Sequence, residues 1–205
     1  MQDPSGPREF VSQFWAILLK VLILASNSPR RHELLLAAGI DHIVQPASVS
    51  EDRRPGESPT GFVRRLAEEK ARAVRSLPIY SAADVVLGAD TIVRLAKQAF
   101  GKPTDDADAA RMLRLLSGRD HWVHTGICIL SGAKRIVDLS STKVSFATLT
   151  EDEIQEYTRS GESLDKAGGY AIQGRASKFV RSIEGSYHNV VGLPVSLVYG
   201  HLRAL

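Results

Sequence analysis

The stretch L-I-L-A-S-N-S-P-R-R-H-E-L-L-L-A-A-G, residues 22–39, has the pattern of a buried strand, a tight polar turn and a helix. Ser28 stands where a helix N-cap is expected, Pro29 at the first helical position, and the closing glycine where a helix ends. Arg30 and Arg31 then fall in the first turn, where the backbone carries unpaired N–H groups and partial positive charge. Two cations are favourable there when an anion lies beside them, and a phosphate is the natural anion. A solvated arginine pair without a ligand is the alternative.

The composition is that of an ordinary globular protein. The chain has 205 residues, of which 43% are hydrophobic and 24% charged, which is enough for one domain with its own core. The net charge is only +3 and the basic residues are scattered, so we expect no stable nucleic-acid binding. A single cysteine, Cys128, excludes a disulfide framework and a cysteine-rich metal site. These features predict a cytoplasmic protein.

The beginning of the chain differs from the rest. Residues 1–9 are polar with two prolines, and residues 10–19 are apolar but too short to span a bilayer. Neither a basic start nor a small-residue cleavage site indicates a signal peptide. We therefore expect residues 1–20 to be a flexible N-terminal extension, residues 21–205 to form a single domain, and the protein not to associate with membranes.

Strand and helix patterns alternate along the remainder of the chain. The predicted strands are 21–25, 42–46, 84–93, 121–130, 136–148 and 179–183. The predicted helices after the first are 59–77, 105–116, 150–161 and a last one that ends near residue 202. Thr150 and Glu153 form a capping box at the start of the third of these. The alternation predicts an α/β fold with a mixed sheet.

Two ionisable side chains fall in apolar surroundings. Lys70 lies in the middle of the apolar face of the predicted helix 59–77, where its ammonium must reach solvent or meet a negative partner. Asp90 lies at the end of the apolar strand 84–93, in the interruption G-A-D-T. A buried acid is costly unless it is paired or binds a cation. A structural aspartate that caps a turn is the alternative for Asp90.

Three further residues are weaker candidates. Lys102 lies in a Gly-Lys-Pro turn that lacks the glycine pattern of a phosphate-binding loop. His121 and His124 lack the spacing of a helical zinc motif, so we expect them to have a role in the sheet or in hydrogen bonding.

The candidate residues together suit a reaction at a phosphate group. The basic side chains that stand out by context are Arg30, Arg31, Lys70 and Lys102, and the acids are Glu51, in a polar loop, and Asp90. Cations that converge on one place suit a polyphosphate, and acids beside them suit a divalent metal that bridges phosphate oxygens. A water that attacks phosphorus needs a carboxylate to take its proton. The residues alone therefore predict phosphoanhydride or phosphoester chemistry, with a plain ion pair of Lys70 and Asp90 as the structural alternative.

Eight segments in this order resemble those of a known family, the Maf nucleoside triphosphate pyrophosphatases, whose fold is similar to that of the inosine triphosphate pyrophosphatases. The segments lie between residues 21 and 202: L-A-S-N-S-P-R-R-H-E-L-L, the loop of Glu51, R-L-A-E-E-K-A, L-G-A-D-T-I-V, G-K-P, L-S-G-R-D-H-W-V-H-T-G, D-K-A-G-G-Y-A-I-Q-G and N-V-V-G-L-P. Each segment alone is unspecific, whereas all eight in order are specific. The resemblance implies an elongated, twisted mixed sheet flanked by helices.

The resemblance also implies an activity. It implies hydrolysis of the α–β phosphoanhydride bond of a pyrimidine nucleoside triphosphate, modified pyrimidines included, to the monophosphate and pyrophosphate. This reaction keeps non-standard nucleotides out of nucleic acids. By this resemblance Asp90 is the proton acceptor, and Glu51 and Asp90 hold Mg²⁺ or Mn²⁺. The residues implied to hold the phosphates are Ser28, Arg30, Arg31, Lys70 and Lys102. A homodimer is implied as well.

Two short motifs are similar to the branch of the family that acts on dTTP and UTP. They are A-D-T at residues 89–91 and Y-x-I-Q at residues 170–173. They imply that Arg30, Thr91 and Gln173 set the base preference, and an amide such as Gln173 can both donate and accept, as a pyrimidine edge requires. Two alternatives stay open: a purine or 7-methyl-GTP pyrophosphatase, and a nucleotide-binding regulator of septum formation.

Overall fold

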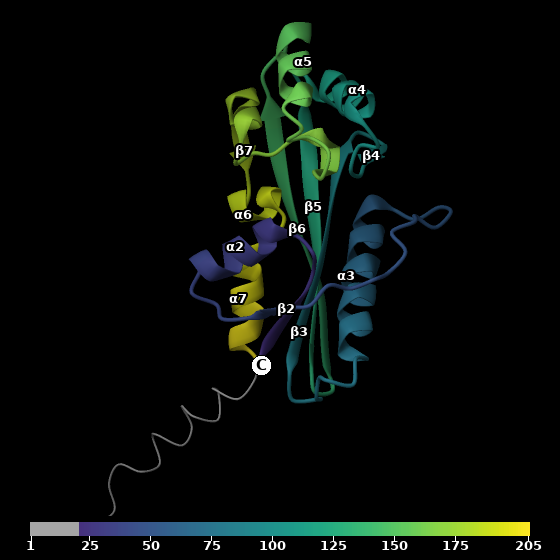
Figure 1. The fold of residues 1–205 in the computed structure, drawn as a ribbon, viewed down its shortest axis with the longest axis vertical. Helices are drawn as coiled ribbons and strands as arrows, with labels where there is room; N and C mark the ends of the chain where they lie inside the picture. Colours follow the sequence, from purple (N-terminus) through teal and green to yellow (C-terminus); the bar gives the residue numbers. More distant parts are fainter. Residues whose placement is uncertain (1–20) are drawn as a thin grey trace, which may run out of the picture.

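The structure, a computed structural model, describes residues 21–205, and its centre is one twisted sheet (Figure 1). The sheet has seven strands in the order β2-β1-β3-β5-β6-β7, with β4 paired to β3 outside this path. β1 runs parallel to β2 and β3, and all other neighbours are antiparallel. The mixed α/β sheet that the sequence predicts is confirmed. The extension predicted for residues 1–20 lies outside the described residues.

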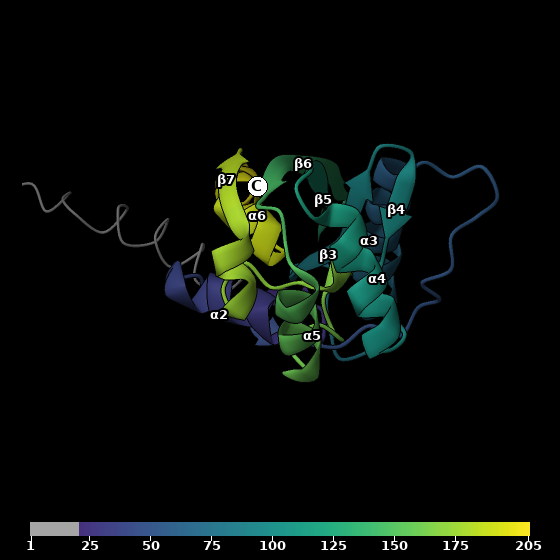
Figure 2. The same ribbon diagram turned by 90° about the horizontal axis from the view of Figure 1, so that it is seen from above.

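Three long strands set the elongated shape. The strands are β1 (Leu22–Ala25), β2 (Ile43–Val44), β3 (Val85–Leu95), β4 (Gln98–Phe100), β5 (Asp120–Ser131), β6 (Lys134–Phe146) and β7 (Val180–Glu184). β6 has 13 residues, a length of roughly 43 Å at about 3.3 Å per residue. Helices lie along both faces of this ribbon, as the view from above shows (Figure 2).

The helices are distributed unequally over the two faces. They are α2 (Pro29–Ala37), α3 (Pro59–Arg75), α4 (Asp106–Leu116), α5 (Glu151–Arg159), α6 (Tyr187–Val191) and α7 (Val195–Arg203), with short 3₁₀ turns at Ala167–Gly169 and Arg175–Phe179. α3 packs on one face, against apolar side chains of β1, β3 and β5. The other helices bury their apolar sides on the opposite face, in a larger core. α5 begins with the predicted capping box of Thr150 and Glu153.

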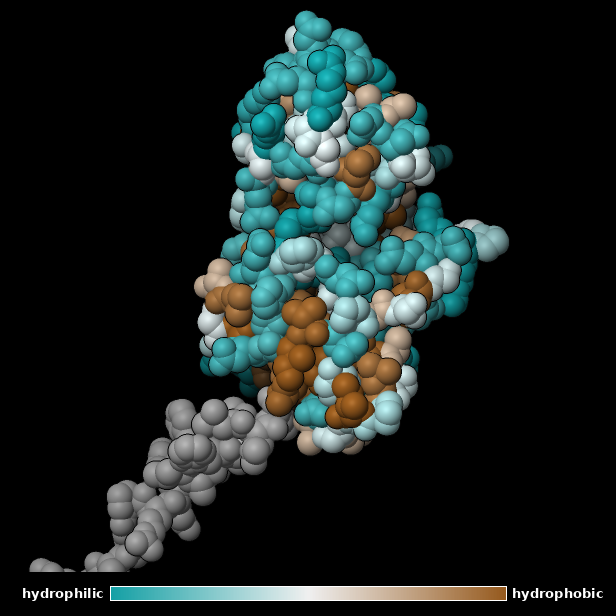
Figure 3. Space-filling model, in the orientation of Figure 1, coloured by the Kyte–Doolittle hydropathy of each residue, from teal (hydrophilic) through white to brown (hydrophobic). Residues whose placement is uncertain are grey.

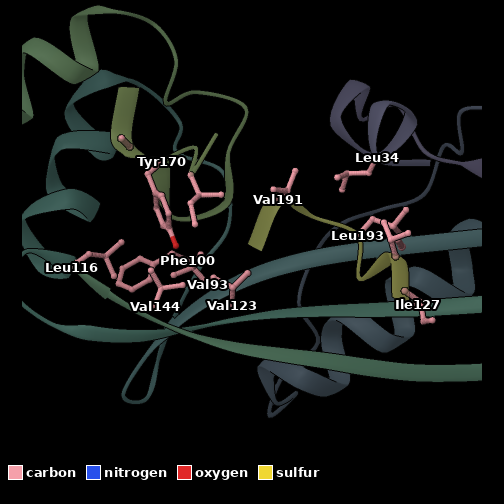
Figure 4. Packing of buried hydrophobic residues seen from close by; sticks show 14 of the residues in the cluster. Leu34, Val93, Phe100, Leu116, Val123, Ile127, Val144, Tyr170, Val191 and Leu193 are labelled. Carbon is pink, nitrogen blue, oxygen red and sulfur yellow. The ribbon is translucent and has the colours of Figure 1, made fainter. Parts of the chain in front are cut away.

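The larger core connects distant parts of the chain (Figure 4). Phe100 of β4 and Leu116 of α4 lie near the ring of Tyr170, and Leu34 of α2 lies near Leu193. Phe100 is only 2% exposed, and burying a side chain of this size stabilises the fold by about 1.5–3 kcal/mol. This core holds α2 and the segment around Tyr170 against the same face of the sheet.

Two glycines let α3 lie directly on the sheet. A Cβ at Gly88 of β3 would lie 2.0 Å from the carbonyl oxygen of Ala67, and one at Gly126 of β5 would lie 2.5 Å from the carbonyl carbon of Val63. Any side chain at either glycine would force the helix away. The close approach sets the distance between α3 and the sheet, and with it the distance of Lys70 from β3.

Several predicted boundaries differ from the structure. Asp90 does not lie at the end of its strand, because β3 continues to Leu95 and β5 pairs with it as far as Arg94. The predicted strand 42–46 is reduced to two residues, the helix 59–77 ends at Arg75, and the strand 136–148 runs from Lys134 to Phe146. The short elements β4 and α6 were not predicted. Both are too short to show a periodic pattern, and tertiary pairing decides whether they form.

Within residues 21–205, no helix combines the length and the apolar character needed to cross a membrane.

Candidate functional site

A gap in the sheet creates the candidate site. β1 ends at Ala25, opposite Gly88 of β3, and β4 begins pairing only at Val93. Between these points β3 has β5 on one side and no strand on the other. Successive side chains of a strand point to opposite faces, so Asp90 and Thr91 reach the gap from the two faces. The gap opens into a cleft of about 350 Å³, a size within the range of ligand pockets.

The cleft is lined mainly by five segments: residues 25–31 around the start of α2, the middle of β3, Gly101–Lys102, residues 165–173, and residues 190–192. Glu51 and Lys70 also line it. In the space-filling view the surface is hollowed at mid-height, where these segments meet (Figure 3). All the residues that the sequence predicts for the site line this one cleft: Ser28, Arg30, Arg31, Glu51, Lys70, Asp90, Thr91, Lys102 and Gln173.

The start of α2 faces the cleft without a capping side chain among the described residues. Ser28 has the extended backbone of an N-cap, but its side chain makes no capping hydrogen bond, unlike the side chains of Ser58, Asp105 and Thr150 at other helices. The first turn of α2 contains no acidic residue. Its N–H groups and partial positive charge are therefore free to bind an anion.

Arg31 is held from three sides. Its Nε donates to the carbonyl oxygen of Gly192 at 2.8 Å, Nη1 to Ser26 Oγ at 3.0 Å and Nη2 to Thr91 Oγ1 at 3.1 Å. Thr91 in turn shares a 2.9 Å hydrogen bond with Thr125. A guanidinium has five N–H bonds, so two remain for a ligand. Burial lowers the pKa of Arg31 and the charge of Asp90 opposes this effect.

Arg30 points in another direction, toward the segment after α5. Its Nη1 donates to Asp165 Oδ2 at 3.1 Å and its Nη2 to the Asp165 carbonyl at 3.2 Å. The two neighbouring arginines therefore reach different walls of the cleft, Arg31 the wall beside Asp90 and Arg30 the wall that carries Gln173.

Lys70 joins the two acids of the site. Its Nζ lies 2.7 Å from Asp90 Oδ1 and 2.7 Å from Glu51 Oε1. Of the two predicted outcomes for its ammonium, the structure therefore has the negative partner and not the exposure to solvent. Amphipathic α3 places Lys70 opposite β3, and the polar loop before α3 brings Glu51 to the same ammonium.

The environment shifts the two carboxyl groups in opposite directions. Burial raises the pKa of Asp90, against the opposing charges of Lys70 and Arg31. Burial alone would raise the pKa of Glu51 too, but the hydrogen bond and charge of Lys70, with Lys102 and Arg31, lower it on balance. A carboxylate with a raised pKa is the stronger base. Asp90 is therefore suited to accept a proton, whereas Glu51 stays ionised.

Two carboxylates of the cleft could hold a divalent cation. Glu51 and Asp90 both contact the ammonium of Lys70, so the two carboxylates lie close together. Mg²⁺ is commonly bound by one or two carboxylates together with substrate phosphates. Among residues 21–205, no group of three or more His, Cys, Asp and Glu side chains has the arrangement of a metal site. His121 makes a hydrogen bond with Tyr170, and His124 makes hydrogen bonds with Ser141 and Arg94, which confirms the predicted hydrogen-bonding role.

Two charged residues of the cleft were missed. Asp165 and Lys166 line it and form an ion pair with each other. They open the motif D-K-A-G-G-Y, and the adjacent acid and base in a polar, glycine-rich segment were the available signal. With Lys166, five cationic side chains of the described residues line the cleft against three carboxylates, those of Glu51, Asp90 and Asp165. The excess of positive charge suits an anion.

The fold and the cleft define an α/β protein with a basic, acid-containing site at a gap in its sheet. The family model for Maf-like proteins matches residues 21–205, and the chain belongs to the Maf family, as its eight segments predicted.

Curated relatives cover most of the chain. The dTTP/UTP pyrophosphatase of Koribacter versatilis is 48% identical, over 89% of this chain and 93% of that protein. The dTTP/UTP pyrophosphatase of Geobacter sp. strain M21 is 49% identical, over 90% and 95%, and that of Bacillus cereus strain AH187 is 44% identical, over 90% and 95%. The solved structure of the Staphylococcus aureus Ham1 protein aligns with 90% of this chain and 99% of its own, at 12% identity and a TM-score of 0.47.

Proposed function

We propose that this protein is a nucleoside triphosphate pyrophosphatase that hydrolyses dTTP and UTP, and modified pyrimidine triphosphates, to the monophosphate and pyrophosphate. It thereby keeps non-standard nucleotides from being incorporated. The observation that carries the proposal is the single cleft that the nine candidate residues line, in a chain 44–49% identical to proteins named dTTP/UTP pyrophosphatase.

The proposal assigns the triphosphate to the basic half of the cleft. The uncapped start of α2 supplies N–H groups, and Ser28, Arg30, Arg31, Lys70 and Lys102 contact phosphate oxygens. Arg31 does so with the two N–H bonds that its protein partners leave free. Because Gly192, Ser26 and Thr91 already fix its guanidinium, binding the phosphate costs little further side-chain entropy.

Asp90 is the proposed proton acceptor. Water attacks phosphorus as the α–β bond breaks, Asp90 takes the proton of the water, and pyrophosphate leaves with the negative charge. Burial raises the pKa of Asp90, and a base is most effective when its pKa approaches the working pH. Lys70 donates to Oδ1 of the carboxylate at 2.7 Å and so orients it.

Glu51 and Asp90 would hold the proposed Mg²⁺ or Mn²⁺. Such an ion, when bound, neutralises phosphate charge and polarises the bond that is cleaved. Glu51 suits this task because its lowered pKa keeps it ionised. Lys70 contacts both acids and limits their mutual repulsion before substrate binds.

Base selection falls to Arg30, Thr91 and Gln173 in this proposal. Gln173 is exposed in the wall of the cleft, and its amide can donate to a carbonyl and accept from the N3–H of uracil or thymine. Thr91 acts through Arg31 and Thr125, with which its hydroxyl makes hydrogen bonds.

The proposal includes a homodimer in the cytoplasm. Support for a protein interface comes from exposed apolar side chains near the β2 edge of the sheet, those of Val21, Ile43 and Val44. Figure 3 shows apolar surface in the lower half of this face, around the position of β2 in Figure 1. Light scattering during size-exclusion chromatography gives the mass: about twice that of the chain supports the dimer, and the mass of one chain contradicts it.

A nucleotide panel tests the function. The full chain is incubated with dTTP, UTP, CTP, ATP, GTP and 7-methyl-GTP in the presence of Mg²⁺ or Mn²⁺, and pyrophosphate and orthophosphate are measured separately. We expect pyrophosphate from dTTP and UTP. Orthophosphate as the first product would contradict cleavage at the α–β bond. Faster hydrolysis of 7-methyl-GTP or of the purine nucleotides would favour the purine alternative, and binding without turnover would favour a regulator of septum formation.

A further inference from the structure

Asp165 lies at the mouth of the cleft, and its carboxylate connects two cations of the cleft wall. One oxygen, Oδ2, accepts from Arg30 Nη1 at 3.1 Å, and the backbone carbonyl of Asp165 accepts from Arg30 Nη2 at 3.2 Å. The other oxygen, Oδ1, contacts Nζ of Lys166. We propose that Asp165 is a positioning residue for base selection: it fixes the direction of the Arg30 guanidinium, and so decides which pyrimidines are accepted. This inference rests on the proposed function.

The backbone around Asp165 is held independently of Arg30. The N–H of Gly168 donates to the carbonyl of Gly101 at 2.9 Å, and the N–H of Lys166 donates to the carbonyl of Ser163 at 3.2 Å. Gly168 has a φ of 74°, and a Cβ there would lie 2.8 Å from a methyl group of Val93. This turn is therefore fitted tightly against β3 and presents the Asp165 carboxylate from a fixed place.

Arg30 is held differently: among residues 21–205, the hydrogen bonds of its side chain go only to Asp165. It is a long side chain on the first turn of α2, and a flexible side chain of this kind adopts many rotamers unless a partner holds it. Two parallel donor contacts to one residue define both the position and the plane of a guanidinium. Asp165 therefore sets the direction in which the guanidinium of Arg30 points.

Asp165 also belongs to the segment that carries Gln173. Further along this segment, the N–H of Ala171 donates to the hydroxyl of Tyr157 at 3.1 Å, and the hydroxyl of Tyr170 shares a 2.8 Å hydrogen bond with His121. The segment is thus anchored to α5 and β5, close to Gln173. Through Asp165, Arg30 is attached to the same anchored segment, so that the two proposed base-selecting residues keep a constant relation to each other.

The hydrogen-bonding groups of the bases show which pyrimidines a fixed Arg30 guanidinium can select. Arg30 has only donors. Uracil and thymine have a carbonyl at C4, which accepts a hydrogen bond, whereas cytosine has an amino group there, which donates. A guanidinium held toward this position favours the carbonyl and opposes the amino group. A guanidinium free to turn away would lose this discrimination, while proton transfer to Asp90 would continue.

The test compares UTP with CTP. For wild type, Asp165→Asn and Asp165→Ala, kcat and KM are measured with both nucleotides. We expect the ratio of kcat/KM for UTP to that for CTP to fall about tenfold, because a misplacement of about 1 Å costs up to about a hundredfold. Any loss of the phosphate contact of Arg30 lowers kcat/KM for both nucleotides by the same factor, so it cancels in the ratio. Asp165→Glu, which keeps the charge, should restore part of the ratio.

Two controls separate positioning from a general effect. Glu184→Gln removes another exposed acid partner of a cation, Lys143 at 2.9 Å. Neither residue lines the cleft, so this variant should leave the ratio unchanged. In an Arg30→Ala background, Asp165→Ala should lower the ratio no further, since the two residues act as one unit. Thermal melting should show that each Asp165 variant is folded, because an exposed ion pair contributes little to stability.

Three results would overturn the inference. They are an equal loss of kcat/KM for UTP and CTP, a further loss of the ratio in the Arg30→Ala background, and a wild-type enzyme that hydrolyses both nucleotides equally well. A wild-type protein that hydrolyses no nucleotide at all would contradict the proposed function itself. The same assay therefore distinguishes the two failures.

Discussion

The ammonium of Lys70 and the carboxylate of Asp90 lie 2.7 Å apart, with side chains only 10% and 12% exposed. The pair links α3 to the middle of β3, and Glu51 approaches the same ammonium from a loop. Removing one partner of a buried pair leaves an uncompensated charge, which typically costs about 3–5 kcal/mol. The pair could therefore serve stability or chemistry, and substitutions can separate the two.

Asp90→Asn should abolish turnover and leave the fold intact. The amide keeps the shape of the carboxyl group but cannot take a proton from water, so we expect kcat to fall by about 10²–10⁴-fold. Lys70 keeps Glu51 as its partner, which limits the loss of stability. Asp120→Asn, on the surface beside Lys143, is the matched control and should keep full activity. Normal turnover together with a stability loss of several kcal/mol would make the pair purely structural.

Lys70→Met should move the acid limb of the pH–activity profile to higher pH. Asp90 must be ionised to accept a proton, so activity is lost as the pH falls through its pKa. Burial already raises that pKa, and Lys70 is the largest opposing influence, so removing the ammonium raises it further. The profile of kcat/KM against pH for UTP measures the shift. An acid limb at the same pH in both proteins would show that Asp90 is not the titrating base.

Gly88→Ala should destabilise the fold and reduce activity together. The new methyl group would meet the carbonyl oxygen of Ala67 at 2.0 Å, which forces α3 and Lys70 away from β3. Overpacking of this kind costs about 1–3 kcal/mol. Gly200→Ala in α7 is the control: its Cβ meets no atom within 4 Å, and alanine in a helix should stabilise by about 0.5–1 kcal/mol. Chemical denaturation measures both, and a wild-type free energy of unfolding for Gly88→Ala would contradict the close approach.

Because of His121, the free energy of unfolding should decrease as the pH is lowered. It is fully buried, and burial lowers its pKa to about 4 from an ordinary 6.5. Below pH 6.5 the imidazole of His121 is protonated in the unfolded chain, but in the folded protein it is protonated only near pH 4. The contribution of neutral His121 to the free energy of unfolding is therefore complete above pH 6.5 and is lost as the pH falls toward 4. The loss amounts to about 3 kcal/mol. Unfolding free energies of wild type and His121→Gln between pH 7 and pH 4 measure it, and equal slopes would refute the assignment.

Local patterns made much of the fold predictable. Ser28-Pro29 correctly predicted the start of α2, and the capping box of Thr150 and Glu153 correctly predicted the start of α5. These signals depend on residues within one turn of each other. The prediction for Asp90 failed for the opposite reason. The interruption G-A-D-T resembles a strand end, yet Gly88 is small so that α3 can approach, and the strand continues because β5 pairs with it.

For the site, the sequence by itself determined which residues were candidates. A cation at a helix start, a lysine on an apolar helix face and an acid inside a strand are each recognisable from their neighbours, because burying or misplacing a charge is costly wherever the chain folds. Only the tertiary structure decided which of them meet. Arg30 reaches Asp165, far along the chain, and Asp90 and Thr91 share a cleft because β1 stops at Ala25, short of β4. Such contacts depend on how strands pair and helices pack over the whole domain, and no local pattern encodes that.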